Sequence, residues 1–144
     1  MDDAPASLGD VVNLHDFEAI ARDRLDPGAY GYYSSGAGDE RTLADNLSAW
    51  AAWRLVPRVL TGSRSPALRT TFLATESSTP FAIAPTALHG LADPDGEMAT
   101  ARAAAASGTL FTLSTASTRT IEAVAEASGS GPRWFQLYVE HDLG

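Results

Sequence analysis

Apolar side chains in the first fifty residues recur at intervals of three and four positions, the spacing of one face of an α-helix. Asn13 is a suitable cap for the first of these segments, and a helix is predicted over about 14–25. Pro27 predicts the start of a second short helix, because proline is favoured in the first helical turn. The same spacing predicts a third helix from Leu43 to Trp50, so this part of the chain is expected to be helical.

The pattern changes over residues 54–80, which are rich in Pro, Gly, Ser and Thr. Short β-branched pieces occur there, such as the run from Thr70 to Leu73. This composition predicts an irregular connector that contains a small hairpin.

Three apolar runs then alternate with two Ala-rich segments, which predicts a βαβαβ order. The runs are 81–84, 110–113 and 134–139. The first helix between them is expected to be capped by Asp93 and ended by Gly108, and the second to span 120–127. The runs begin at intervals close to the roughly 30 residues of one unit of a (β/α)₈ barrel. A doubly wound sheet would give the same local pattern, and that alternative stays open.

The predicted fold class is therefore α/β, with a helical segment and connector over 1–80 and a first βαβαβ portion over 81–144. Parallel strands are normally buried on both faces, and unpaired edges promote aggregation. A sheet of three such strands is a poor independent fold. We therefore expect the 144 residues to be an incomplete part of a longer protein.

The composition excludes several classes of chemistry. All ten basic residues are Arg, against eighteen acidic residues, and the net charge is -8. The absence of Lys excludes a Schiff-base lysine and a phosphate-loop lysine, and the charge disfavours a nucleic-acid partner. The absence of Cys excludes disulfides, thiolate metal sites and cysteine nucleophiles.

The first ten residues are acidic and lack the basic and then apolar order of a signal peptide, and no run of about 18 apolar residues occurs. We expect a cytoplasmic protein without a membrane segment. His15, His89 and His141 have no partner at metal-ligand spacing, so no metal site is predicted.

Side chains that could bind a ligand follow the three predicted strands, at the edge where parallel strands carry their functional residues. They are Pro85, Thr86 and Ala87 after the first strand, Ser114 after the second, and Gln136 and Tyr138 on the third. Small residues, a hydroxyl, an amide and a phenol suit a flat polar ligand. The alternative is structural: Ser114 and Ser117 would cap the next helix, and Gln136 would satisfy neighbouring backbone.

Five ordered pieces of sequence resemble the FMN-dependent 2-hydroxy-acid oxidase and dehydrogenase family, which includes glycolate oxidase, lactate oxidase and mandelate dehydrogenase. They are FEAIARDRL, YYSSGAGDERTLADN, FAIAPTALHGLADPDGEMATARAAAASGT, LSTAST and WFQLYV, and the likeness covers about residues 13–142. The resemblance implies a (β/α)₈ TIM barrel preceded by a helical segment. It also implies FMN as cofactor, a small 2-hydroxy acid as substrate, oxygen or a respiratory carrier as electron acceptor, and a homo-oligomer.

The resemblance also implies roles for particular side chains, which neutral donors such as phenols and amides can fill. Tyr32 resembles the tyrosine that binds the substrate carboxylate, and Tyr138 the one beside the substrate hydroxyl. Pro85, Thr86 and Ala87 resemble the segment that lies along the flavin. Ser114 and Gln136 resemble the side chains that bind the isoalloxazine edge.

Several parts of the family's site have no counterpart here. The histidine base, the arginine that grips the carboxylate, the lysine near the flavin and the phosphate-binding groups come from later strands in the family. No catalytic residue is therefore assigned, and the chain alone is expected to be inactive. Two alternatives remain: a non-catalytic remnant, or a small α/β module that binds flavin or another ligand.

Ala116 stands where glycolate oxidases carry a bulky aromatic residue. The small residue resembles mandelate dehydrogenases and implies space for a larger substrate.

Overall fold

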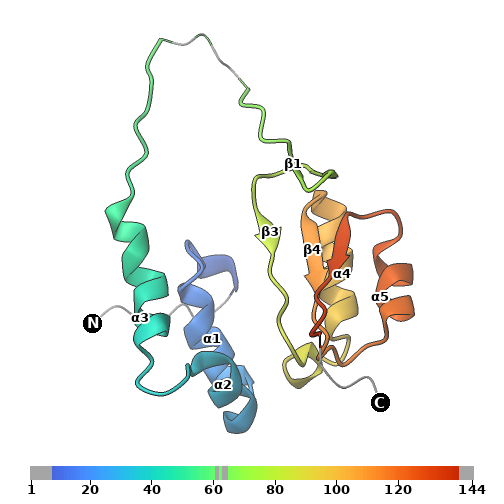
Figure 1. Ribbon diagram of the computed structural model, residues 1–144. Coiled ribbons are helices and arrows are strands. Elements are labelled where there is room, and N and C mark those ends of the chain that lie inside the picture. The colour runs from blue at the N-terminus through green and yellow to red at the C-terminus, as the bar shows by residue number, and fades with distance from the viewer. Residues whose placement is uncertain (1–7, 61, 63–64, 140–144) are drawn as a thin grey trace. The chain divides into compact units, whose positions relative to one another are not determined.

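The computed structural model describes residues 8–60, 62 and 65–139 (Figure 1). The chain divides into two compact units, Met1–Gly62 and Ser63–Gly144. The first unit is helical, and the second contains every strand of the described residues. The domain boundary proposed at residue 80 stays a prediction.

The first unit contains the three predicted helices, with a short 3₁₀ helix near either end. Its elements are η1 (Leu8–Asp10), α1 (Asp16–Arg24), α2 (Pro27–Ser34), α3 (Arg41–Ser48) and η2 (Ala49–Ala52). Asn13 Oδ1 accepts hydrogen bonds from the backbone N–H groups of His15 at 2.8 Å and Asp16 at 3.2 Å. The predicted capping role of Asn13 is wrong: the cap position of α1 is His15, which makes no side-chain capping hydrogen bond, and Asn13 instead closes the turn that leads into the helix. Pro27 is the first residue of α2, as predicted.

A polar network connects α1 with α2. The Tyr30 hydroxyl donates to Glu18 Oε1 at 2.9 Å and accepts from Arg22 Nη2 at 2.9 Å. Arg22 also pairs with Glu18 across one helical turn. Tyr30 of α2 is therefore linked to one acidic and one basic side chain of α1.

The second unit contains a hairpin and a parallel sheet. The hairpin pairs β1 (Thr70–Phe72) with β2 (Thr75–Ser77), and the sheet has the order β3 (Ala82–Ile83), β4 (Leu110–Leu113), β5 (Arg133–Phe135). The predicted order of strands and the small hairpin are confirmed. The predicted length of the third strand is wrong: β5 ends at Phe135, because its partner β4 ends opposite it at Leu113.

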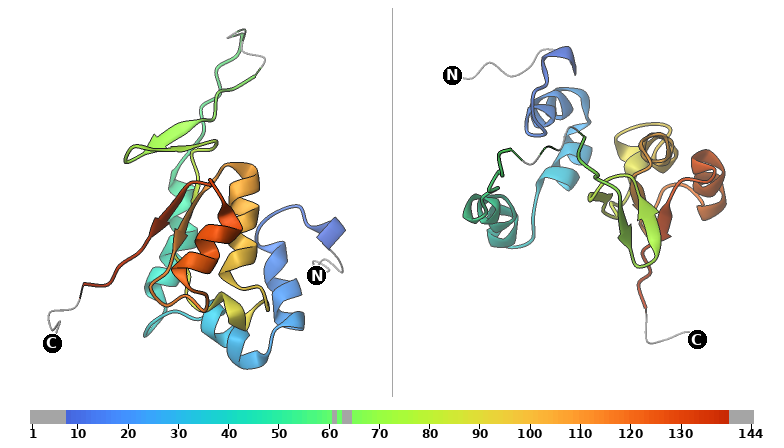
Figure 2. Two further views of the ribbon diagram at one scale, coloured as in Figure 1. Left: turned by 90° about the vertical axis from the view of Figure 1, so that its right-hand side faces the viewer. Right: turned by 90° about the horizontal axis from the view of Figure 1, so that it is seen from above.

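Helices α4 (Glu97–Ser107) and α5 (Ile121–Ser128) connect the parallel strands and lie on the same side of the sheet (Figure 2). The short helix η3 (His89–Leu91) lies between β3 and α4. Gly108 ends α4 with a φ of 64°, as predicted, because glycine adopts this left-handed conformation without strain. The capping role predicted for Asp93 is wrong. Gly96 precedes α4 with a φ of 56°, and Asp93 instead accepts a hydrogen bond from the N–H of Asp95.

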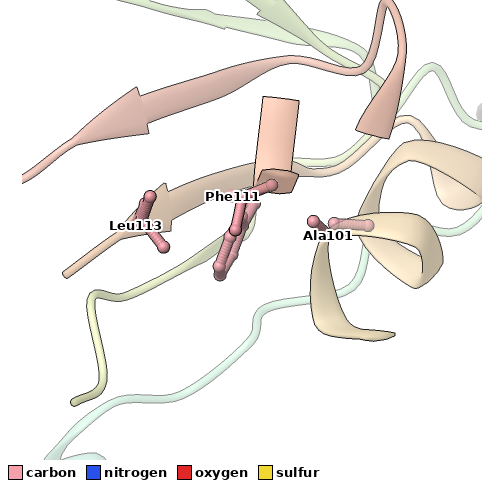
Figure 3. Close-up of a cluster of buried hydrophobic side chains, with 5 residues drawn as sticks. Ala101, Phe111 and Leu113 are labelled. Atoms are coloured by element: carbon pink, nitrogen blue, oxygen red, sulfur yellow. The ribbon is translucent and has the colours of Figure 1, made fainter. Parts of the chain in front are cut away.

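The core of this unit lies between the sheet and its two helices (Figure 3). Ala101 and Ala104 of α4 meet Phe111 and Leu113 of β4, and Val124 of α5 completes the cluster. Alanine brings the α4 backbone close to the sheet, so the aromatic ring of Phe111 fills the space that larger helix residues would otherwise occupy.

The hairpin is attached to the sheet by a tryptophan. The indole Nε1 of Trp134 in β5 donates to Thr75 Oγ1 in β2 at 2.9 Å. Leu73 and Ala74 form the two-residue turn between β1 and β2, and both have positive φ, 41° and 68°. This is the turn geometry that matches the twist of a hairpin. One side-chain hydrogen bond thus joins two parts of the chain that are 59 residues apart.

Candidate functional site

The predicted ligand-binding residues of the second unit lie at one edge of the sheet. β3, β4 and β5 are parallel, so their carboxyl ends meet at the same edge. Ser114 and Gln136 directly follow β4 and β5, and the loop after β3 carries the three small residues Pro85, Thr86 and Ala87. Pro85 and Thr86 are exposed and Ala87 is half-buried. The edge thus offers small side chains and backbone next to an amide.

The side chain of Gln136 is held in one orientation. Its Oε1 accepts the backbone N–H of Thr115 at 3.1 Å and the hydroxyl of Ser114 at 3.5 Å. The backbone is fixed too, since Gln136 N–H donates to the Leu113 carbonyl at 2.8 Å and the Thr115 hydroxyl donates to the Gln136 carbonyl. Because both side-chain bonds use Oε1, the amide Nε2 is the atom that remains to donate to a ligand.

The structural alternative for the serines is wrong. Thr120 caps α5, because its Oγ1 accepts the N–H of Ala123 at 3.2 Å. Ser114 and Ser117 instead each accept the N–H two residues ahead and form tight local turns. Ser114 is 5% exposed. The expectation that Gln136 satisfies neighbouring backbone is confirmed, and it is compatible with binding a ligand through Nε2.

The two tyrosines assigned to the substrate belong to different units. Tyr138 follows β5, two residues after Gln136, and is 66% exposed. Tyr32 lies on α2 in the first unit, is 49% exposed, and packs edge-to-face on Tyr33 at 5.3 Å between ring centroids. Both phenols are thus accessible within their own units.

A buried carboxylate behind the edge was not identified from the sequence. Glu97, the first residue of α4, is fully buried. Its Oε1 accepts the backbone N–H of His89 at 3.0 Å and of Thr118 at 2.9 Å, and its Oε2 accepts the Thr118 hydroxyl at 2.6 Å. The one available signal was spacing, because Glu97 shares a helix face with the core residues Ala101 and Ala104.

The environment of Glu97 keeps it ionised. Burial raises the pKa of this carboxyl, but the hydrogen bonds from the Thr118 hydroxyl and N–H, from its own backbone N–H and from His89 outweigh burial. Together they lower the pKa from 4.5 to about 2. Glu97 is therefore an anion at neutral pH, and it is suited to accept hydrogen bonds and not to transfer a proton.

The histidines do not form a metal site in the described structure. His89 is bound through its backbone to Glu97, and its Nδ1 lies 3.1 Å from Thr100 Oγ1. His141 lies outside the described residues. Among residues 8–60, 62 and 65–139, no three acidic or histidine side chains gather in a way that could hold a metal ion.

Comparison with known proteins identifies the arrangement. Residues 21–144 match the family of FMN-dependent dehydrogenases, which is most of the chain. The chain belongs to the FMN-dependent dehydrogenase family. It is 46% identical over 135 residues to glycolate oxidase 1 of Zea mays and 42% identical over 132 residues to 2-hydroxyacid oxidase 1 of Homo sapiens. These matches cover 94% and 92% of this chain and 36% of each relative.

Solved structures of FMN-dependent dehydrogenase relatives share the fold. A lactate oxidase of Pediococcus acidilactici superposes with a TM-score of 0.86 at 38% identity, and a mandelate oxidase with 0.84 at 33%. The superpositions cover 92% of this chain and 37% and 39% of those chains. The predicted fold class is thus confirmed: the helices and short parallel strands match part of a TIM barrel. The chain spans little more than a third of the length of these relatives.

Membership of this family makes FMN the group to test against the strand-end residues. An isoalloxazine ring is flat and carries hydrogen-bond acceptors along one edge, and the residues present fit that shape. Gln136 Nε2 remains to donate because Oε1 is bound by Ser114 and Thr115, and the loop after β3 carries small side chains against which a ring can lie. Among the residues that the structure describes, no helix has both the length and the apolar character needed to cross a bilayer.

Proposed function

We propose that the complete protein to which this chain corresponds oxidises a 2-hydroxy acid to a 2-oxo acid with FMN. In this proposal the 144 residues supply one rim of the flavin and substrate site. The observation that carries the proposal is the fixed orientation of Gln136 between Ser114 and Thr115, at the carboxyl edge of a parallel sheet that matches FMN-dependent relatives.

The flavin rim would be formed by two kinds of contact. Ser114 and Gln136 would lie at the isoalloxazine edge, where a neutral donor tunes the electronics of the ring without adding charge. Pro85, Thr86 and Ala87 would lie along the ring. FMN, when bound, accepts the hydride that leaves the substrate.

The substrate contacts would be phenols. Tyr32 would donate a hydrogen bond to the substrate carboxylate, and Tyr138 would donate to the oxygen that changes from hydroxyl to carbonyl. A phenol can stabilise negative charge on oxygen and does not compete as a base, which is the reason tyrosine suits both positions. The proton acceptor would come from the part of the barrel that the chain does not span.

A chimera tests the proposal: residues 1–144 of this chain followed by the remaining carboxyl-terminal part of the maize glycolate oxidase, which is 46% identical over the matched region. We expect the purified chimera to hold FMN and to oxidise a 2-hydroxy acid. Gln136→Ala should weaken FMN binding about fivefold, the effect of one neutral hydrogen bond. Tyr32→Phe should lower kcat/KM and leave FMN binding unchanged.

The control is Glu122→Ala, which removes an exposed side chain in the first turn of α5. It should alter neither FMN binding nor turnover. A folded chimera that holds no FMN would contradict the proposal, as would an unchanged FMN affinity in Gln136→Ala.

A further inference from the structure

The residues proposed to meet the flavin follow β3, β4 and β5, and one buried carboxylate joins the loops after β3 and β4. Glu97 accepts hydrogen bonds from His89, in the loop after β3, and from Thr118, in the loop after β4. The first loop carries Pro85, Thr86 and Ala87, and the second carries Ser114 and Thr115. Burying a charge costs free energy unless the charge is fully hydrogen-bonded. The hydrogen bonds from both loops are therefore needed to keep the Glu97 carboxylate buried.

The surroundings of Thr118 are packed closely. Gly90 N–H donates to Thr118 Oγ1 at 3.0 Å, and the same oxygen donates to Glu97. A Cβ on Gly90 would lie 2.8 Å from that hydroxyl oxygen, and one on Gly96 would lie 3.1 Å from it. We call this group the Glu97 junction: Glu97, His89, Gly90, Gly96 and Thr118.

Short paths lead from the Glu97 junction to the proposed flavin contacts. Leu88 N–H donates to the Ala116 carbonyl at 3.1 Å. A backbone hydrogen bond therefore also joins the two loops, next to the contacts of Glu97. The neighbour of Ala116 is Thr115, whose N–H holds Gln136 Oε1. Displacement of Thr118 would therefore move the donor that orients Gln136.

We propose that Glu97 is a positioning residue for the flavin rim, which holds the loops after β3 and β4 in the arrangement that presents Ala87 and Gln136 to the ring. This inference rests on the proposed function for its ligand. It concerns a residue that touches neither flavin nor substrate. An ionised carboxylate is suited to the task, because one group accepts three hydrogen bonds from two separate loops.

The first test uses the folded chimera and measures hydrogen exchange of the amides of His89 and Thr118, with the amide of Val124 in α5 as internal reference. Glu97→Met removes both acceptor oxygens, and we expect exchange at His89 and Thr118 to rise about tenfold relative to Val124. Glu97→Gln keeps one oxygen for both amides and should retain their protection relative to Val124. Unchanged relative protection in Glu97→Met would overturn the inference.

A second pair of variants covers the case in which Glu97→Met fails to fold. Thr118→Val removes only the hydroxyl that bonds Glu97 and Gly90, and Thr118→Ser keeps it. We expect faster relative exchange at His89 and Gly90 in Thr118→Val and recovery in Thr118→Ser. Equal exchange in the two variants would overturn the inference.

The second test separates positioning from general stability by a double-mutant cycle in the chimera. Glu97→Met and Gln136→Ala should each weaken FMN binding, and the double variant should lose at least threefold less affinity than the product of the two single losses. Strictly multiplicative losses would show a role in stability alone and would overturn the inference. A wild-type chimera without FMN would contradict the proposed function, whereas the exchange measurements would still decide the role of Glu97 in joining the loops.

Discussion

Gln136 shows how a neutral side chain acquires a single direction. A primary amide can point either its oxygen or its nitrogen at a ligand, and the two ends have opposite polarity. Here the N–H of Thr115 and the hydroxyl of Ser114 both bind the oxygen. The amide nitrogen is therefore the end of the side chain that remains to donate a hydrogen bond, as the proposed flavin contact requires.

Glu97 should make the stability of the chain depend on acid. Its pKa is about 2 in the folded state against 4.5 for the ordinary side chain, so its contribution is complete above pH 4.5 and is lost as the pH falls toward 2. Across this range the free energy of unfolding should fall by about 3 kcal/mol more in the wild type than in Glu97→Gln. Urea titrations of both proteins between pH 6 and pH 2 measure the difference. Parallel pH profiles would contradict the low pKa.

Ala116 should control which substrate the completed enzyme prefers. It is exposed at the strand edge, between the turn of Ser114 and the Glu97 junction. If this loop faces substrate, three additional carbons could gain about 2 kcal/mol there, or roughly 30- to 60-fold in specificity. Ala116→Trp in the chimera should therefore shift the ratio of kcat/KM for mandelate over glycolate toward glycolate. An unaltered ratio would show that Ala116 does not line the substrate pocket.

At the scale of elements, close approach of α4 to the turn before β5 determines how the sheet and helices pack. Gly131 lies in this turn, and a Cβ there would be 2.5 Å from Cβ of Ala105 and 2.9 Å from its Cα. The neighbouring backbone would have to move to accommodate any side chain. The turn can lie this close to α4 because Gly131 has no side chain and Ala105 has a small one.

Gly131→Ala should lower the free energy of unfolding by about 1–3 kcal/mol, the usual cost of overpacking. Gly31→Ala is the matched control, because Gly31 lies in α2 with no atom within 4 Å of the added carbon. It should raise stability by about 0.5–1 kcal/mol through helix propensity. Denaturant titration of both variants decides the matter, and equal stabilities would argue against close packing at Gly131.

Most elements were predictable from local pattern, because helix spacing, strand rhythm and glycine at the end of α4 depend on neighbouring residues. Features that depend on a distant partner were not. The length of β5 follows from where β4 ends, and the start of α4 from the backbone conformation of Gly96 instead of the side chain of Asp93. The cap of α5 was one of several adjacent hydroxyls, which a pattern cannot distinguish.

The candidate site also has features that local sequence predicts and features that depend on a distant partner. Its location at the strand ends follows from the parallel order, and its polar residues were identified by type and by resemblance. The role of Glu97 was not predictable, because its hydrogen bonds reach a residue 21 positions away. An acidic residue in the first turn of a helix is also favoured by the helix dipole, so the sequence offers no reason to expect that Glu97 is buried.

At the scale of the whole molecule, this chain spans about 36% of the curated relatives and carries one rim of the proposed site. We expect the isolated 144-residue chain to show no oxidation of glycolate, lactate or mandelate, since loss of a general base alone costs roughly 10²–10⁴-fold. FMN should bind it far more weakly than the chimera, because the phosphate-binding groups are expected elsewhere. Turnover assays and absorbance titration with FMN measure both. Flavin-dependent turnover that Tyr32→Phe abolishes would contradict this expectation.

The hydrogen bond between Trp134 and Thr75 also provides an optical probe. The chain has three indoles, and Trp50 and Trp53 are 75% and 76% exposed in the first unit. Trp134 is half-buried in the second unit, with its ring nitrogen bound to the hairpin. Replacement of Trp50 and Trp53 by phenylalanine would leave a single fluorophore, whose emission wavelength and lifetime report whether the hairpin is docked on β5. Folding of the second unit could then be followed by tryptophan fluorescence, because the described part of the first unit would contain no tryptophan.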